Sequence, residues 1–91
     1  MPKPRSGGRA SAAAVIRQQQ EDQLTRLLRA RLAADEWEPG QRLPTVPALA
    51  ADYQAGHGTI RRALGRMQDE GLIVTLPRYG TFRSRRDRAK G

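Results

Sequence analysis

The residues best suited to chemistry in this sequence are arginines in two adjoining segments. Arg61, Arg62 and Arg66 lie in a short amphipathic stretch, and Arg78 lies in a tight turn that follows it. A guanidinium group presents a planar fork of N–H donors that matches phosphate oxygens and the edge of guanine. A basic helix followed by a basic hairpin is the layout of a winged helix-turn-helix, in which one element enters the major groove and the other contacts the backbone or the minor groove. The sequence therefore predicts double-stranded DNA as the partner.

The overall charge agrees with this prediction. The 91 residues include 17 Lys and Arg against 9 Asp and Glu, which gives a net charge of +8 and an isoelectric point near 11.4. The cations concentrate in residues 2–9, 61–66 and 78–90, and the only lysines are Lys3 and Lys90. If six phosphates are neutralised, the logarithm of the binding constant should fall with that of salt at a slope of about −5. The alternative is that the charge serves solubility alone, with two basic tails.

Other functions find little support. Because the chain has no cysteine, it has no disulfide, thiolate metal site or cysteine nucleophile. The acidic pairs Asp35-Glu36 and Asp69-Glu70 lie at expected helix ends rather than in an enclosed site for acid–base catalysis. No apolar run approaches the roughly 18 residues that cross a bilayer, and the N-terminus lacks the apolar core of a secretory signal. We therefore expect a cytoplasmic protein that is not an enzyme and needs no metal, cofactor or membrane.

Apolar spacing predicts three helices. The first covers about residues 17–34, the second begins after Thr45 as N-cap, and the third covers about 57–70 and ends at a glycine C-cap, Gly71. The apolar stripe of the first helix consists of Leu24, Leu27, Leu28 and Leu32. That of the second consists of Val46, Leu49, Ala50 and Tyr53, and that of the third of Ile60, Ala63, Leu64 and Met67.

A small hairpin follows the third helix. Residues 73–76 and 81–83 are expected to be its strands, with 77–80 as the turn and 41–43 as a further segment able to pair with it. The fold class expected is α+β, mostly α: a winged helix-turn-helix of three helices and a small antiparallel wing. We expect residues 1–14 to be a disordered basic arm, 15–83 the DNA-binding domain and 84–91 a basic tail. The aromatic residues expected in the core are Trp37, Tyr53 and Phe82.

From about Leu24 to Arg83 the chain resembles the DNA-binding module of the GntR family of bacterial regulators. The motifs that carry the resemblance are EPGQRLPTV, LAADY, GTIRRAL, DEGLI and YGTF, in one continuous stretch. The resemblance implies a fold of three helices with a wing, operator binding as a homodimer, and association with the bacterial nucleoid when bound. Members of the family typically carry a C-terminal effector-binding domain, and we expect no small-molecule control of that kind within this chain.

The sequence departs from the family pattern at several positions. Pro47 stands where the second helix usually has an arginine, Gly56 where a serine usually opens the recognition helix, and His57 where an arginine follows. Arg78 replaces the first glycine of the usual Gly-x-Gly at the wing tip. Since two of the usual base- or phosphate-contacting side chains are replaced, a particular operator sequence cannot be carried over.

The third helix is expected to supply most of the binding residues. Thr59 should hold a phosphate, and Arg61 should contact a phosphate or a base edge, although both can also be ordinary solvated residues of a first turn. Arg62 points most directly away from the predicted core and either reaches a base or lies in solvent. His57 either donates to guanine or is an exposed residue of the capping region, and Gly58 lets the backbone approach DNA or has no special role.

The wing should supply the remainder. Arg78 is the favoured contact to a narrow minor groove. Tyr79 is expected to pack on the wing rather than touch sugar, and Gly80 to set the geometry of the hairpin. The full set of predicted DNA-binding residues is Thr45, His57, Gly58, Thr59, Arg61, Arg62, Arg66, Arg78, Tyr79 and Gly80.

The leading hypothesis is a sequence-specific transcriptional regulator, most simply a repressor that occludes a promoter. One alternative is an architectural or excisionase-like factor of a mobile element, which would bind several direct repeats and bend the DNA. Another is a winged helix that binds an acidic protein. RNA binding is weaker, since no exposed aromatic platform is evident.

Overall fold

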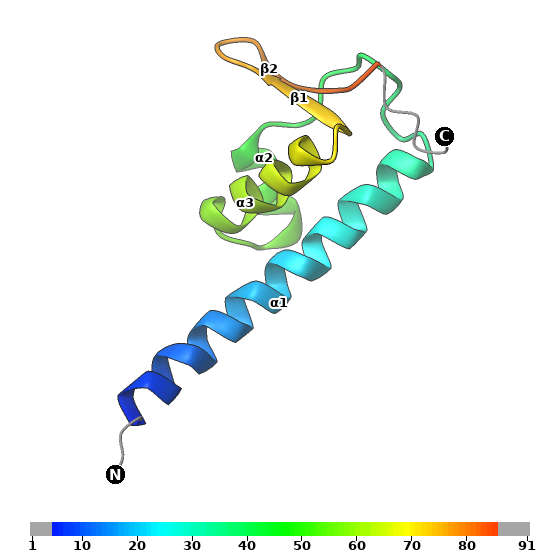
Figure 1. The fold of residues 1–91 in the computed structure, drawn as a ribbon. Helices are drawn as coiled ribbons and strands as arrows, with labels where there is room; N and C mark the ends of the chain where they lie inside the picture. The colour runs from blue at the N-terminus through cyan, green and yellow to red at the C-terminus, as the bar shows by residue number, and fades with distance from the viewer. Residues whose placement is uncertain (1–4, 86–91) are drawn as a thin grey trace.

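The computed structural model describes residues 5–85, with side chains from residue 12 onward. Three helices are followed by a two-stranded sheet: α1 (Arg5–Ala33), α2 (Val46–Tyr53), α3 (His57–Asp69), β1 (Ile73–Leu76) and β2 (Gly80–Arg83) (Figure 1). The predicted fold class is confirmed, because α2 and α3 pack beside α1 and the antiparallel β1–β2 hairpin projects from them as the wing. The predictions for residues 1–4 and 86–91 lie outside the described residues.

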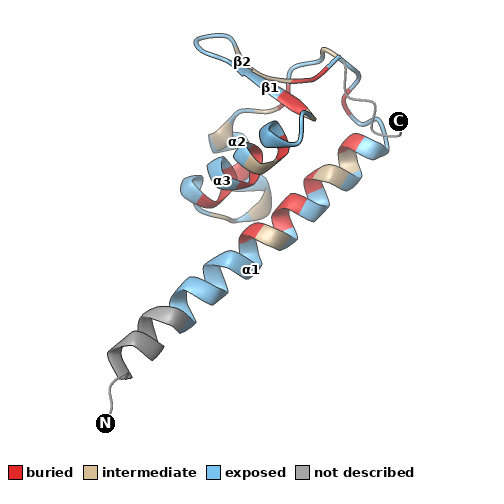
Figure 2. Cartoon of the chain, viewed as in Figure 1, coloured by how far each residue is buried: buried red, intermediate tan, exposed pale blue. Residues whose placement is uncertain are grey.

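α1 is longer than the sequence predicted. It begins at Arg5, so residues 5–14 are helical rather than the disordered arm expected. Alanine is the strongest helix former, and the run Ala12–Ala14 lets the helix continue toward the N-terminus despite the two glycines in its first turns. Residues 12–20 are all exposed, and this part of α1 extends beyond the rest of the domain (Figure 2).

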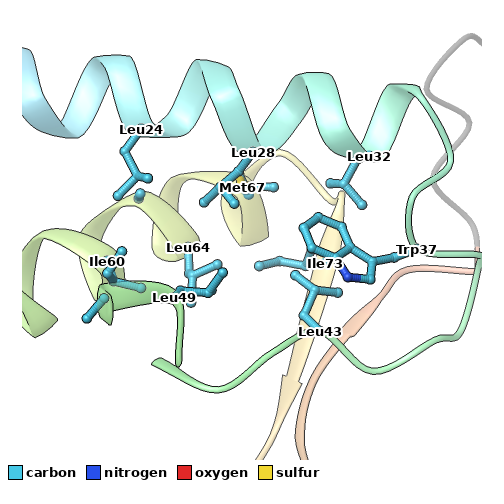
Figure 3. Packing of buried hydrophobic residues seen from close by; sticks show 12 residues of the cluster. Leu24, Leu28, Leu32, Trp37, Leu43, Leu49, Ile60, Leu64, Met67 and Ile73 are labelled. Atoms are coloured by element: carbon cyan, nitrogen blue, oxygen red, sulfur yellow. The ribbon is translucent and has the colours of Figure 1, made fainter. Parts of the chain in front are cut away.

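The core lies between α1 and the helix-turn-helix. Leu24 and Leu28 of α1 point toward α3, which carries Ile60 and Met67, and Leu32 points toward Trp37 (Figure 3). All four residues predicted for the α3 stripe are buried: Ile60, Ala63, Leu64 and Met67. Trp37 is also buried, as predicted, while Tyr53 and Phe82 are half-buried at the edge.

Leu27 was wrongly included in the α1 stripe. At about 100° per residue it lies roughly 60° beyond Leu24, on the side away from Leu28, and it is 46% exposed. The buried arc of α1 is instead completed by Thr25, whose hydroxyl donates to the Glu21 carbonyl at 2.7 Å, and by Glu21 itself. The arc that meets α3 thus contains a carboxylate among its leucines.

Local capping fixes where the short helices begin and end. Thr45 is the N-cap of α2, as predicted, and its Oγ1 accepts a hydrogen bond from Ala48 N at 3.2 Å. Gly71 ends α3 with a φ of 79°, and the amides of Gly71 and Leu72 donate to the carbonyls of Gln68 and Met67. This pattern is a Schellman motif, which requires a left-handed residue and explains the glycine.

The wing pairs Ile73 with Arg83 and Leu76 with Gly80 at its two ends. The expected pairing of residues 41–43 is also present: Arg42 bridges to Phe82, and Leu43 N donates to the Thr81 carbonyl at 2.8 Å. The chain before α2 therefore runs along the wing and ties it to the helices.

Candidate nucleic-acid interface

The N-terminal turn of α3 presents its polar atoms to solvent. The helix begins at His57, and its N-cap, Gly56, has no side chain with which to satisfy the first amides. Free amides and the helix dipole make such a terminus attractive to an anion such as phosphate. His57, Gly58 and Arg61 are all exposed here.

Arg61 carries an available charge on this turn. Among the described residues it has no ion-pair partner within 4.0 Å. Its guanidinium is therefore able to approach a phosphate or a base without first leaving a carboxylate. Its contact to DNA stays a prediction.

Thr59 does not share this exposure. It is only 8% exposed and faces α1, where it lines a pocket of about 450 Å³ together with Leu24, Leu27 and Tyr53. On α3 it lies one position before Ile60, so it falls beside the buried stripe. The phosphate contact predicted for Thr59 is not tested, and its burial speaks against it.

Arg62 and Arg66 are held by α1, which the sequence did not predict. Arg62 Nε donates to Glu21 Oε1 at 3.0 Å, and Arg66 Nη1 donates to Asp22 Oδ1 at 2.6 Å and lies 3.4 Å from Glu21 Oε2. The hydrogen bond from Arg66 is the main cause that lowers the pKa of Asp22. Arg62 is exposed, as predicted, but its long side chain also turns sideways to reach a carboxylate on α1.

Thr45 is exposed at the start of α2. Its hydroxyl oxygen accepts the capping hydrogen bond, and the hydroxyl proton remains able to donate. A phosphate contact here would be compatible with its capping role, and it too stays a prediction.

Arg78 stands at the tip of the wing in a left-handed conformation, with a φ of 72°. Pro77 precedes it and Tyr79 N donates to the Leu76 carbonyl at 2.9 Å, which is the arrangement of a type II turn. This turn ordinarily takes glycine at the position of Arg78. The left-handed backbone accounts for the glycine that the family pattern has there.

The other two residues at the wing tip, Tyr79 and Gly80, differ in exposure and in role. Tyr79 is 69% exposed, so the expectation that it packs on the wing is wrong. Gly80 has a φ of 116°, and a Cβ on it would lie 2.8 Å from Arg42 Nε. Gly80 therefore shapes the hairpin, as expected, and also makes room for Arg42.

Arg42 is a candidate that sequence reasoning missed. It is exposed, bridges to β2, and its guanidinium lies across Gly80 near the wing tip. The signal was available, since residues 41–43 were expected to pair with the hairpin. Glu21 and Asp22 were missed for a different reason, because no local pattern connects α1 to α3 across about 40 residues.

The part of the chain that the structure describes gives little support for a metal site, a membrane span or an acid–base site. Its histidine and carboxylates do not gather into any group of three that could hold a metal ion. Within residues 5–85, no helix combines the length and the apolar character that crossing a bilayer would require. Three of the carboxylates predicted at helix ends are paired with arginines: Asp35 with Arg83, Glu36 with Arg31 and Glu70 with Arg29.

Known proteins share both the sequence and this geometry. The histidine utilization repressor of Klebsiella aerogenes is 44% identical over 46 residues, which is 50% of this chain and 19% of that protein. The DNA-binding domain of AraR, solved in complex with operator ORR3, is 25% identical with a TM-score of 0.68, over 70% of this chain and 77% of that one. A GntR family transcriptional regulator from Listeria monocytogenes has the same fold, with a TM-score of 0.71 at 22% identity over 75% of this chain and 60% of that one.

The chain thus spans about a fifth of the length of the Klebsiella relative that it matches. The model of the family described as "Bacterial regulatory proteins, gntR family" matches residues 20–82. This match takes in the C-terminal half of α1, the helix-turn-helix and nearly all of the wing. The chain belongs to the gntR family of bacterial regulatory proteins and has the winged-helix fold of that family's DNA-binding domain.

Proposed function

We propose that this protein is a transcriptional repressor that binds double-stranded DNA sequence-specifically, with α3 in the major groove and the wing against the backbone or minor groove. The observation that carries the proposal is the placement of Arg61 and Arg78. One is an arginine on the exposed first turns of a helix, with no ion-pair partner among the described residues, and the other stands at the tip of the hairpin. The relatives support repression and DNA as the partner, since one is a repressor by name and another is solved with its operator.

The residues divide into two roles. Arg61 and His57 are the candidates for base edges, because they start the helix that would enter the groove. Thr45 and the free amides of α3 would hold the phosphate backbone in register. Arg78 and Tyr79 would contact sugar, phosphate or the minor groove from the wing.

We propose further that the protein works in the cytoplasm as a homodimer on DNA. Two copies would place two α3 helices in successive major grooves about 34 Å apart, so that the operator would be a palindrome. Support for a dimer comes from family membership rather than from any contact within the chain.

Selection of bound sequences from a random duplex library tests the proposal. Recovery of one short palindrome supports a regulator, while several direct repeats with strong bending would support an architectural factor instead. On the selected site, Arg61→Ala should weaken binding by about 5- to 150-fold. Arg26→Ala is the matched control, since Arg26 is exposed on the side of α1 turned away from α3. If the selection yields no enriched sequence, or the two variants bind alike, the proposal fails.

A further inference from the structure

The Glu21 carboxylate is the one acidic group of α1 that is both buried at the α1–α3 contact and bound to two arginines of α3 within the described residues. On the helical wheel it lies between Leu28 and Leu32, near the middle of the buried arc. Its side chain is 11% exposed, whereas that of Arg62 is 52% exposed. The buried carboxylate of Glu21 thus holds the exposed guanidinium of Arg62 in place.

The hydrogen bond to Glu21 does not engage the terminal nitrogens of Arg62. Glu21 Oε1 takes the Nε proton at 3.0 Å, and neither terminal nitrogen of Arg62 has a hydrogen-bond partner among the described residues. The Nη1 atom lies 3.4 Å from where a Cβ on Gly58 would be, so the side chain runs back along α3 toward its N-terminus. The missing side chain at Gly58 gives the guanidinium room to lie there.

Arg66 is held differently. Its Nη1 atom faces both Asp22 and Glu21, at 2.6 and 3.4 Å, and its side chain is only 37% exposed. Arg66 therefore uses one of its two terminal nitrogens, Nη1, to tie α3 to α1. Glu21 and Asp22 thus hold Arg66 against α1, and Glu21 also orients Arg62.

We propose that Glu21 is a positioning residue for DNA recognition, which fixes Arg62 by its Nε so that the terminal nitrogens face a base edge beside the N-terminal turn of α3. This inference rests on the proposed DNA-binding function and extends it to a residue that touches no DNA. An arginine fixed in one geometry reads a base better than a mobile one, because less side-chain entropy is lost when it binds. The expected consequence of losing Glu21 is a loss of discrimination rather than of general affinity.

The test compares the affinity of the full chain for its selected operator and for random duplex DNA. Glu21→Gln keeps the size of the side chain but removes the charge that holds two arginines, and the ratio of the two affinities should fall about fivefold or more. Asp22→Asn is the matched control, because it removes one negative charge from the same surface yet touches Arg66 and not Arg62. A charge change that acts through phosphates alters both affinities alike and leaves their ratio unchanged.

Two further variants separate positioning from packing. Arg62→Lys keeps the charge but cannot bind Glu21 and present a fork to DNA at once, so it should lower the ratio as Glu21→Gln does. In an Arg62→Gln background, Glu21→Gln should change the ratio no further. Melting temperatures follow any loss of stability, which by itself would leave the ratio intact.

The outcomes distinguish the two proposals. If the parent prefers no sequence, the DNA-binding function fails and this inference with it. If the parent discriminates and Glu21→Gln, folded, discriminates equally well, only the positioning role is overturned. An equal loss in Asp22→Asn would also overturn it, because a general charge effect would then be sufficient, and Arg62→Lys decides the matter if Glu21→Gln does not fold.

Discussion

Replacing Arg78 with glycine should make the protein more stable and a weaker DNA binder at the same time. Arg78 occupies a left-handed backbone conformation with a φ of 72°, at the second central position of a type II turn. Left-handed geometry brings Cβ close to the following carbonyl oxygen, a clash that glycine does not have. A non-glycine residue held there points to a function that repays the strain.

The size of the stability effect follows from two opposing terms. Relief of the left-handed strain is worth about 1–2 kcal/mol. Glycine gives back about 0.4–1 kcal/mol, because it enlarges the conformational freedom of the unfolded chain. The net gain is therefore about 0–1.6 kcal/mol, centred on about 0.8 kcal/mol. In a domain of this size about 1 kcal/mol corresponds to about 4–8 °C in melting temperature. The wing-tip residue is exposed, so no packing is lost.

The binding effect has the opposite sign. Losing one phosphate or minor-groove contact should make the salt slope shallower by about 0.9. Thermal melts and salt titrations on the selected operator measure the two effects on the same samples. Arg78→Lys is the matched control, since it keeps both the charge and the strained backbone and should leave stability unchanged. A destabilised Arg78→Gly, or one that binds with the parent's salt slope, would refute the reasoning.

Three further predictions concern how α1 and α3 hold together. Gly65→Ala should stabilise the domain by about 0.5–1 kcal/mol in denaturant titrations, because Gly65 lies inside α3 with open space where its Cβ would be. Leu28→Ala, which empties a fully buried site between the helices, should cost about 2–5 kcal/mol in the same assay, and a loss below 1 kcal/mol would contradict the core as described. Glu70→Gln should cost about 0.2–1 kcal/mol at neutral pH, since Glu70 accepts from Arg29 Nε at 2.9 Å across an exposed pair. That hydrogen bond lowers the pKa of Glu70 below its usual 4.5, so its contribution is complete above pH 4.5 and is lost as pH falls through the lower folded-state pKa; acid melts of the variant should lack this loss.

Local chemistry was sufficient to predict most of the fold. Thr45, Gly71 and the apolar stripe of α3 act through neighbours within one or two turns, and such effects can be inferred from spacing alone. The pairing of residues 41–43 with the wing was also expected and is present. The same logic identified Arg78 as the wing tip, although not that its backbone is left-handed.

What sequence reasoning missed depends on contacts between distant segments. Glu21 and Asp22 meet Arg62 and Arg66 across about 40 residues. Helical spacing places Glu21 on the buried arc of α1, but no pattern in the sequence signals which side chains of α3 it meets. Leu27 was misplaced because four leucines at helical spacing cover more of the circumference than one neighbouring helix can bury. Whether each of these side chains of α1 is buried, paired or exposed depends on where α3 packs against α1.

The ion pairs alter what the net charge means for binding. A slope near −5 corresponds to about six neutralised phosphates. Arg66 already faces Asp22 and Glu21, so a phosphate that binds it meets two neighbouring negative charges that offset the attraction. Arg61 has no such competitor among the described residues, and it therefore contributes its full share to attraction. The attraction of α3 for phosphates is thus weaker than its number of arginines would suggest. The acidic pair on α1 reduces this general attraction and instead orients one guanidinium, that of Arg62.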